Sequence, residues 1–114
     1  MNKSPESNLL DYIPVQQIEW QENPETSLII IMKPKFDNKF LRKYFLPQLK
    51  SPNFRVNLDE YGSRVWKLID GRRTVLQIAD SLKDMYGESV EPAYERVGNF
   101  MRSLENNKFI VYRD

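Results

Sequence analysis

Residues 59–87 contain the start and stop signals of two consecutive helices, and these signals constrain the fold more than any other feature. The Asp70-Gly71 pair ends the first helix, because glycine adopts the left-handed conformation that a helix end requires. Thr74 and Gln77 have the spacing of a capping box, in which each side chain bonds the backbone N–H of the other residue. The pattern therefore predicts two short helices joined by a tight turn.

Three helices are predicted in the C-terminal half. The first is capped by Asp59, the second ends at Gly87, and the third begins near Pro92 and runs to Asn106-Asn107. Apolar residues recur at helical spacing in each, which predicts one buried face per helix. The expected core positions are Tyr61, Val65, Leu68 and Ile69 in the first helix, Val75, Ile78, Ala79, Leu82 and Met85 in the second, and Val97, Phe100, Met101 and Leu104 in the third.

Four segments have the composition of strands. Residues 15–20 and 28–33 flank a polar Asn-Pro turn, and we predict that they pair as a hairpin. Residues 53–58 alternate apolar and polar side chains, which is typical of a half-buried strand. Residues 109–112 form a last short strand. The predicted order is three strands, three helices and a final strand, an α+β chain.

The segment 34–52 is predicted to be an amphipathic helical insertion with aromatic residues on one side and basic residues on the other. The net charge of the chain is only +1, but seven basic side chains and one acidic side chain fall in residues 33–55. Three interpretations stay open: a solvated face over buried aromatics, a docking surface for an acidic peptide or enzyme, or contact with nucleic acid or an anionic membrane. The docking residues would be Lys39, Arg42 and Lys43.

Composition argues against an enzyme. The 114 residues include no His and no Cys, which removes the commonest general base, thiol nucleophiles and thiolate metal ligands. We therefore expect no catalytic residue, metal or cofactor. Asp80 and Asp84 lie at i, i+4, but two carboxylates from one helix rarely hold a metal alone. The turn from Gly71 to Thr74 could bind a phosphate, and the alternative is a capped turn with exposed arginines.

Length and segment composition set the domain organisation. We expect a flexible tail at residues 1–8 and a single domain over 9–114, because a chain of 114 residues can bury one core but not two. The longest apolar run, Leu28–Met32, is far shorter than the roughly 20 residues of a membrane span. No secretion signal is visible either. A cytoplasmic location is the expectation that follows.

A DNA-binding function deserves consideration, since three helices with strands are the elements of a winged helix. The recognition helix of such a protein presents basic side chains to the groove. The third predicted helix offers Arg96 and Arg102, but it and the residue before it also present Glu91, Glu95 and Glu105. These carboxylates would repel a phosphate backbone, so we expect no nucleic acid partner.

A set of spaced positions in the C-terminal half matches a known family pattern: Leu58-Asp59, Gly62, Val65-Trp66, Asp70-Gly71, Thr74-Val75, Ile78-Ala79 and Leu82. The stretch "VGNFMRSLENNKFIV" is similar to the closing helix and strand of the same family. With these residues the sequence resembles the PqqD family of pyrroloquinoline quinone biosynthesis proteins, which are precursor-peptide recognition elements.

The resemblance implies a winged-helix-like fold in which a three-stranded antiparallel sheet packs on three C-terminal helices. It also implies a function without catalysis: the domain binds the leader of a ribosomally made precursor peptide and presents it to a radical-SAM or other peptide-modifying enzyme. The peptide would lie as an added strand beside the third strand, in a groove formed with the third helix. Pyrroloquinoline quinone biosynthesis is one setting for this role.

The corresponding residues here are Arg55, Val56 and Asn57 on the strand and Tyr94, Gly98 and Met101 on the helix. Glycine in the middle of a helix costs roughly 1 kcal/mol relative to alanine. Gly98 therefore indicates either a shallow groove for a peptide or close packing on another element. Tyr94 and Met101 could equally be core residues.

The insertion at 34–52 departs from the short pyrroloquinoline protein and indicates a divergent branch of the family. Two other functions stay open: a winged-helix DNA-binding protein, and a small structural subunit of a larger enzyme. The sequence identifies neither the peptide nor the modifying enzyme, and it leaves a homodimer open.

Overall fold

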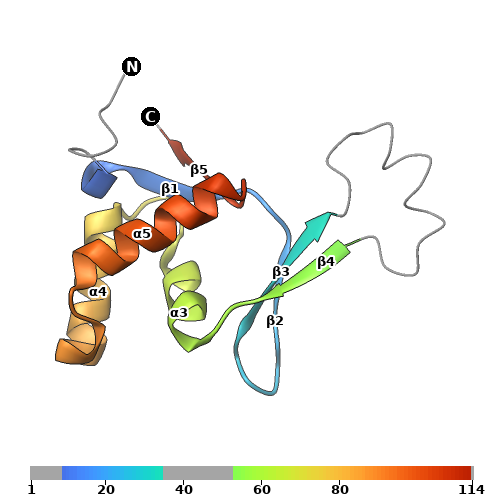
Figure 1. Ribbon diagram of the computed structural model, residues 1–114, viewed down its shortest axis with the longest axis horizontal. Coiled ribbons are helices and arrows are strands. Elements are labelled where there is room, and N and C mark those ends of the chain that lie inside the picture. The colour runs from blue at the N-terminus through green and yellow to red at the C-terminus, as the bar shows by residue number, and fades with distance from the viewer. Residues whose placement is uncertain (1–8, 35–52, 114) are drawn as a thin grey trace. The chain divides into compact units, whose positions relative to one another are not determined.

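A computed structural model of the chain describes residues 9–34 and 53–113. These residues form two compact units (Figure 1). The first contains residues 9–17 and 61–113, and the second contains residues 18–34 and 53–60. The predicted basic helix at 34–52, with Lys39, Arg42 and Lys43, lies outside the described residues apart from Pro34. The predicted tail at residues 1–8 also lies outside them.

The first unit contains the helices and one two-stranded antiparallel sheet. The sheet joins the strand at its N-terminal end to the strand at its C-terminal end, so both ends of the unit meet in one ribbon. Its elements are η1 (Leu9–Asp11), β1 (Ile13–Gln16), α3 (Glu60–Leu68, from Tyr61 onward), α4 (Val75–Tyr86), η3 (Gly87–Val90), α5 (Ala93–Asn106) and β5 (Ile110–Arg113).

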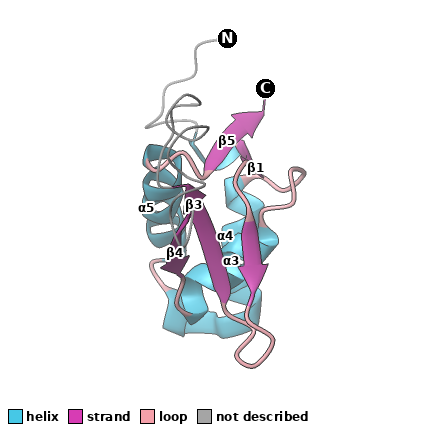
Figure 2. Ribbon diagram, turned by 90° about the vertical axis from the view of Figure 1, so that its right-hand side faces the viewer, coloured by secondary structure: helices cyan, strands magenta, loops and turns pink. Residues whose placement is uncertain are grey.

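The second unit is a three-stranded antiparallel sheet with the order β2-β3-β4. Its strands are β2 (Trp20–Glu22), β3 (Ile29–Pro34) and β4 (Asn53–Asn57). Figure 2 shows β3 beside β4, its antiparallel partner. The three-stranded antiparallel sheet and the three helices confirm the predicted α+β fold class. The winged-helix arrangement and the single-domain organisation stay predictions.

The prediction of one strand over residues 15–20 is wrong. Backbone pairing with the C-terminal strand continues as far as Gln17, whose N–H donates to the carbonyl of Phe109 at 3.0 Å. Pairing with β3 begins at Glu19, whose carbonyl accepts from the N–H of Met32 at 2.9 Å. The chain therefore passes from one sheet to the other at Ile18. This change of sheet explains why the alternation of side chains across the segment is imperfect.

The capping box of the second helix and the two glycine stops are confirmed, and the cap at Asp59 stays a prediction. In α4 the Thr74 hydroxyl accepts from the Gln77 N–H, and the Gln77 side chain accepts from the Thr74 N–H. Gly71 has φ of +79° and Gly87 has φ of +63°, so both helix ends use a backbone conformation that L-residues rarely adopt. These interactions involve only neighbouring residues, whereas the N–H of Val75 at the start of α4 also donates to the distant carbonyl of Tyr12 at 2.9 Å.

Most of the predicted core is buried, with informative exceptions. Met85 was expected inside but is 48% exposed. Tyr61, Leu68 and Phe100 are only half-buried. Trp66, absent from the expected core positions, is 0% exposed and is among the largest fully buried side chains. Trp66 follows Val65 on α3, so the buried face of this short helix is wider than a narrow apolar stripe indicates.

Candidate functional site

The candidate site begins with β4, which lies at one edge of its sheet. Within the described residues, β3 is the only strand that pairs with it. In an antiparallel pair, residues alternate between those that exchange hydrogen bonds with the partner strand and those whose backbone groups point away. The direction of each N–H on β4 therefore decides which residues are available to a further strand.

Two hydrogen bonds determine these directions. The Leu58 N–H donates to the Ile29 carbonyl at 2.9 Å, which makes this pair a hydrogen-bonded one. In the register of β3 and β4, Val56 opposite Ile31 is then also a hydrogen-bonded pair. The N–H of Met32 points the other way, toward Glu19, so Met32 does not exchange hydrogen bonds with its β4 partner Arg55. The backbone groups of Arg55 and Asn57 therefore point to the outer edge.

The side chains of β4 follow the predicted alternation. Phe54 and Val56 lie on one face, and Arg55 and Asn57 lie on the other, where both are exposed. Phe54 is 55% exposed, an unusually open position for a large aromatic side chain. Among the described residues, the outer edge of β4 thus combines backbone groups that no other strand pairs with, an apolar side chain on one face, and polar side chains on the other.

Tyr94, which was predicted to contact a peptide, lies at the start of α5 and points toward α4. Its hydroxyl donates to Asp80 Oδ1 at 2.7 Å, and Lys83 Nζ lies 4.8 Å from the centre of its ring. The hydrogen bond with Tyr94, together with the charge of Glu91, raises the pKa of Lys83. The polar end of Tyr94 therefore already links two helices, and its contact with a peptide stays a prediction.

Gly98 and Met101 are both buried, and Met101 is 0% exposed. A Cβ atom on Gly98 would lie 3.4 Å from Leu9 Cδ2 of η1, so Leu9 covers the helix at this point. Close approach of another element is one of the two explanations that the sequence left open for this glycine. A peptide could contact Gly98 only if Leu9 moved, and the peptide-binding role of both residues stays a prediction.

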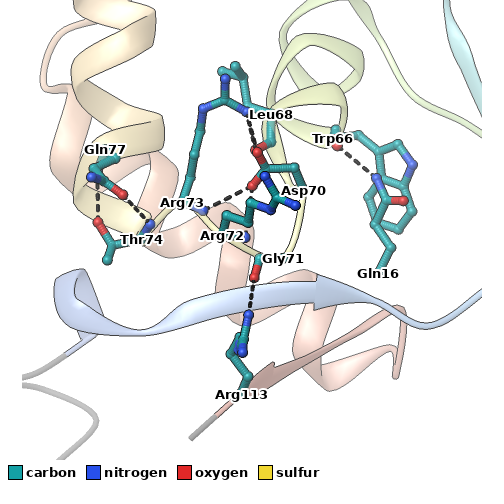
Figure 3. A network of polar contacts seen from close by, with 10 residues as sticks. All are labelled: Gln16, Trp66, Leu68, Asp70, Gly71, Arg72, Arg73, Thr74, Gln77 and Arg113. Carbon is teal, nitrogen blue, oxygen red and sulfur yellow. Dashed lines mark hydrogen bonds and ion pairs between the residues drawn. The ribbon is translucent and has the colours of Figure 1, made fainter.

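The turn between α3 and α4 shows how the chain satisfies the groups that an anion would bind (Figure 3). The Asp70 carboxylate accepts from the N–H groups of Arg72 and Arg73, each at 2.9 Å. The Arg73 guanidinium donates to the same carboxylate at 2.9 Å. Arg113 donates to the carbonyl of Gly71 at 2.7 Å. Asp70 thus accepts the N–H groups that a bound phosphate would use, which favours the capped-turn interpretation.

These contacts predict a pH-dependent contribution to stability. The hydrogen bonds from the N–H groups of Arg73 and Arg72 hold the pKa of Asp70 below its ordinary value of 3.8. A carboxyl group whose pKa is lower in the folded protein than in the unfolded chain stabilises the fold at pH values above its unfolded-state pKa. This stabilisation disappears as the pH falls through the folded-state pKa. We expect Asp70→Asn to lower the urea midpoint at pH 7, and the difference from wild type to shrink below about pH 4.

The effect of Asp70→Asn should stay below about 1 kcal/mol, because the side chain is 37% exposed and its ion pair is screened by solvent. Asp84→Asn removes the same charge from an exposed position of α4 and is the matched control. A difference between Asp70→Asn and wild type that is equal at pH 7 and pH 3 would contradict this role for Asp70.

Tyr61 of α3 and Arg96 and Phe100 of α5 form a cluster that was not predicted from the sequence. Arg96 Cζ lies 4.4 Å from the centre of the Tyr61 ring, and the rings of Tyr61 and Phe100 meet edge to face at 6.3 Å. The four-residue spacing of Arg96 and Phe100 places them on one side of α5. The only sequence signal was this spacing, because Tyr61 is distant in the chain.

Neither a metal site nor a membrane span is found in residues 9–34 and 53–113. No three His, Cys, Asp or Glu side chains gather there as metal ligands would. None of the helices in these residues combines the length and apolar character needed to cross a bilayer.

A family model described as Coenzyme PQQ synthesis protein D (PqqD) matches residues 49–110, more than half of the 114-residue chain. The chain belongs to the PqqD family. This match confirms the resemblance, and it includes β4, α3, α4 and α5. Members of the PqqD family are non-catalytic accessory proteins that bind a precursor peptide and work with a modifying enzyme. Comparison with curated proteins and with solved structures gave no match.

Proposed function

We propose that this chain is a non-catalytic peptide-binding module. It binds the leader of a ribosomally made precursor peptide as an added strand on the outer edge of β4, and it presents that peptide to a modifying enzyme such as a radical-SAM protein. Pyrroloquinoline quinone biosynthesis is the setting that the PqqD family favours. The observation that carries the proposal is the outward direction of the backbone groups of Arg55 and Asn57.

Strand addition fits the chemistry of this edge. An open strand edge presents N–H and C=O groups at a fixed spacing, and an extended peptide satisfies them whatever its side chains are. Alternate side chains of the peptide would then lie beside Phe54 on one face, or beside Arg55 and Asn57 on the other. Backbone bonds supply affinity in this mode of binding, and the pockets for alternate side chains supply specificity.

Two further sets of residues belong to the proposal. Tyr94, Gly98 and Met101 of α5 would contact the peptide, which for Gly98 requires displacement of Leu9. Lys39, Arg42 and Lys43 would attract an acidic partner, where exposed charges act mainly on the rate of association.

The proposal is tested by selecting binders from an mRNA-displayed library of random twelve-residue peptides. Each selected peptide is then synthesised with a single N-methyl group at successive backbone positions. An added strand uses every second N–H, so we expect binding to fall at alternate positions and to persist at those between them. Uniform sensitivity, uniform tolerance, or a library without binders would contradict strand addition.

Duplex DNA provides the comparison with the alternative function. Binding to phosphates releases counterions and weakens steeply with salt, whereas strand addition depends on salt only weakly. We expect the selected peptides to show the shallow dependence. Tight binding of duplex DNA with a steep dependence would favour a nucleic acid partner instead.

A further inference from the structure

Arg96 is held in a defined position on α5. Its guanidinium stacks over the Tyr61 ring at 4.4 Å, and its Nη1 donates to the Ser89 carbonyl at 3.3 Å. Phe100, one turn further along the helix, contacts the same tyrosine edge to face. The contact with the ring and the contact with the carbonyl together favour one orientation of the guanidinium.

This arginine has unused binding capacity. A guanidinium carries five N–H donors, and only the contact with Ser89 uses one in the part of the chain that the structure describes. No carboxylate among the described residues lies within ion-pair distance of Arg96, although Arg73 and Lys83 each have one. Arg96 is half-buried, so part of its side chain stays accessible to a ligand.

We propose that Arg96, Tyr61 and Phe100 form a subsite that binds a carboxylate of the peptide. The proposal rests on the proposed function and adds a preference for an acidic residue. The planar fork of arginine matches a carboxylate, with two parallel hydrogen bonds. The aromatic rings beside the guanidinium exclude some of the water that would otherwise weaken the interaction.

The subsite and β4 are close in the sequence. Tyr61 follows Asn57, the last residue of β4, by four positions. An extended peptide of twelve residues is about 40 Å long, by the usual rise of about 3.3 Å per residue. A phosphopeptide fits less well, because the charge of a phosphate is normally met by several arginines.

The test compares peptide selections on three forms of the protein. Display fixes the C-terminus of each peptide in a covalent linkage, so any acidic preference must come from side chains. We expect peptides selected on the wild type to share Asp or Glu at one position. The preference should disappear on Arg96→Gln and persist on Arg102→Gln, which removes the same charge from an exposed position of the same helix.

A double-mutant cycle then measures the interaction directly. For one selected peptide and its Glu→Gln or Asp→Asn analogue, we expect about tenfold weaker binding of the analogue to wild type. The analogue and the parent peptide should bind Arg96→Gln equally. Arg96→Lys keeps the cation over Tyr61 without the planar fork, so it should fold normally and show an intermediate preference. Peptides with free and amidated C-termini separate side-chain carboxylates from the terminal one.

The possible failures are distinct. Selected peptides without an acidic preference, or with one that survives Arg96→Gln, would overturn the subsite and leave strand addition standing. Circular dichroism shows whether Arg96→Gln is folded. If it is unfolded, the acidic preference is compared between wild type and Arg96→Lys instead. If Arg96→Lys is folded and keeps both the acidic preference and the coupling energy of wild type, the proposal that the planar fork of Arg96 binds the carboxylate would be wrong. A library without N-methyl-sensitive peptides would overturn both the proposed function and the subsite.

Discussion

Replacing Asn57 with proline should weaken peptide binding by about tenfold or more while barely changing the stability of the protein. Proline removes the backbone N–H, and the N–H of Asn57 points to the outer edge of β4 rather than toward β3. A lost hydrogen bond is worth about 1 kcal/mol, and the proline ring also obstructs the incoming strand. Arg55→Pro should behave in the same way, because the N–H of Arg55 has the same direction.

Proline at Val56 should have the opposite effect. The Val56 N–H is directed toward Ile31 inside the sheet, and Ile31 is 0% exposed. Its loss leaves a buried carbonyl without its donor, which costs about 1–3 kcal/mol in the free energy of unfolding. We therefore expect Val56→Pro to lower the urea midpoint strongly, and to lower peptide binding only through loss of folded protein.

The matched controls are Arg55→Ala and Asn57→Ala, which remove the same side chains and keep the N–H groups. Isothermal titration with a selected peptide gives the affinity, and urea denaturation gives the stability. If Arg55→Pro, Val56→Pro and Asn57→Pro changed stability and affinity in parallel, β4 would not be an open edge. Full loss of binding in Asn57→Ala would instead assign the effect to the side chain.

The features that the sequence predicted correctly depend on neighbouring residues. The stop at Gly71 and the capping box of Thr74 and Gln77 involve partners within three positions, so the pattern of residue types is enough to place them. The alternation on β4 is equally local. The direction of its N–H groups is not local, because it depends on the register with β3 and on the hydrogen bond between Leu58 and Ile29.

The features that the sequence missed involve residues far apart in the chain. Gln17 pairs with Phe109, and no local pattern announces that partner, so residues 15–20 were assigned to a single strand. The stacking of Arg96 on Tyr61 joins two helices in the same way. Burial of a residue such as Met85 also depends on which element covers it, and here 48% of that residue stays exposed.

Trp66 gives the largest expected loss of stability. Its residue is 0% exposed, and its backbone carbonyl accepts from Gln16 Nε2 at 2.9 Å (Figure 3). Trp66→Ala keeps that hydrogen bond but leaves a cavity, and such substitutions cost about 3–5 kcal/mol. Domains of this size are stable by about 5–15 kcal/mol, so we expect a large fraction of the variant to unfold well below the wild-type urea midpoint.

A core role for Trp66 also predicts what should not change. Trp66→Phe keeps an aromatic ring, so it should lose less stability and bind a selected peptide with wild-type affinity once the folded fraction is taken into account. Trp20→Ala is the control, since Trp20 is 39% exposed and surface substitutions usually cost about 0.5 kcal/mol or less. Unfolding is followed by far-UV circular dichroism, because each change removes one of only two tryptophans. Normal stability with weak binding in a folded Trp66→Phe would assign this tryptophan, which belongs to the PqqD pattern, to the peptide site rather than to the core.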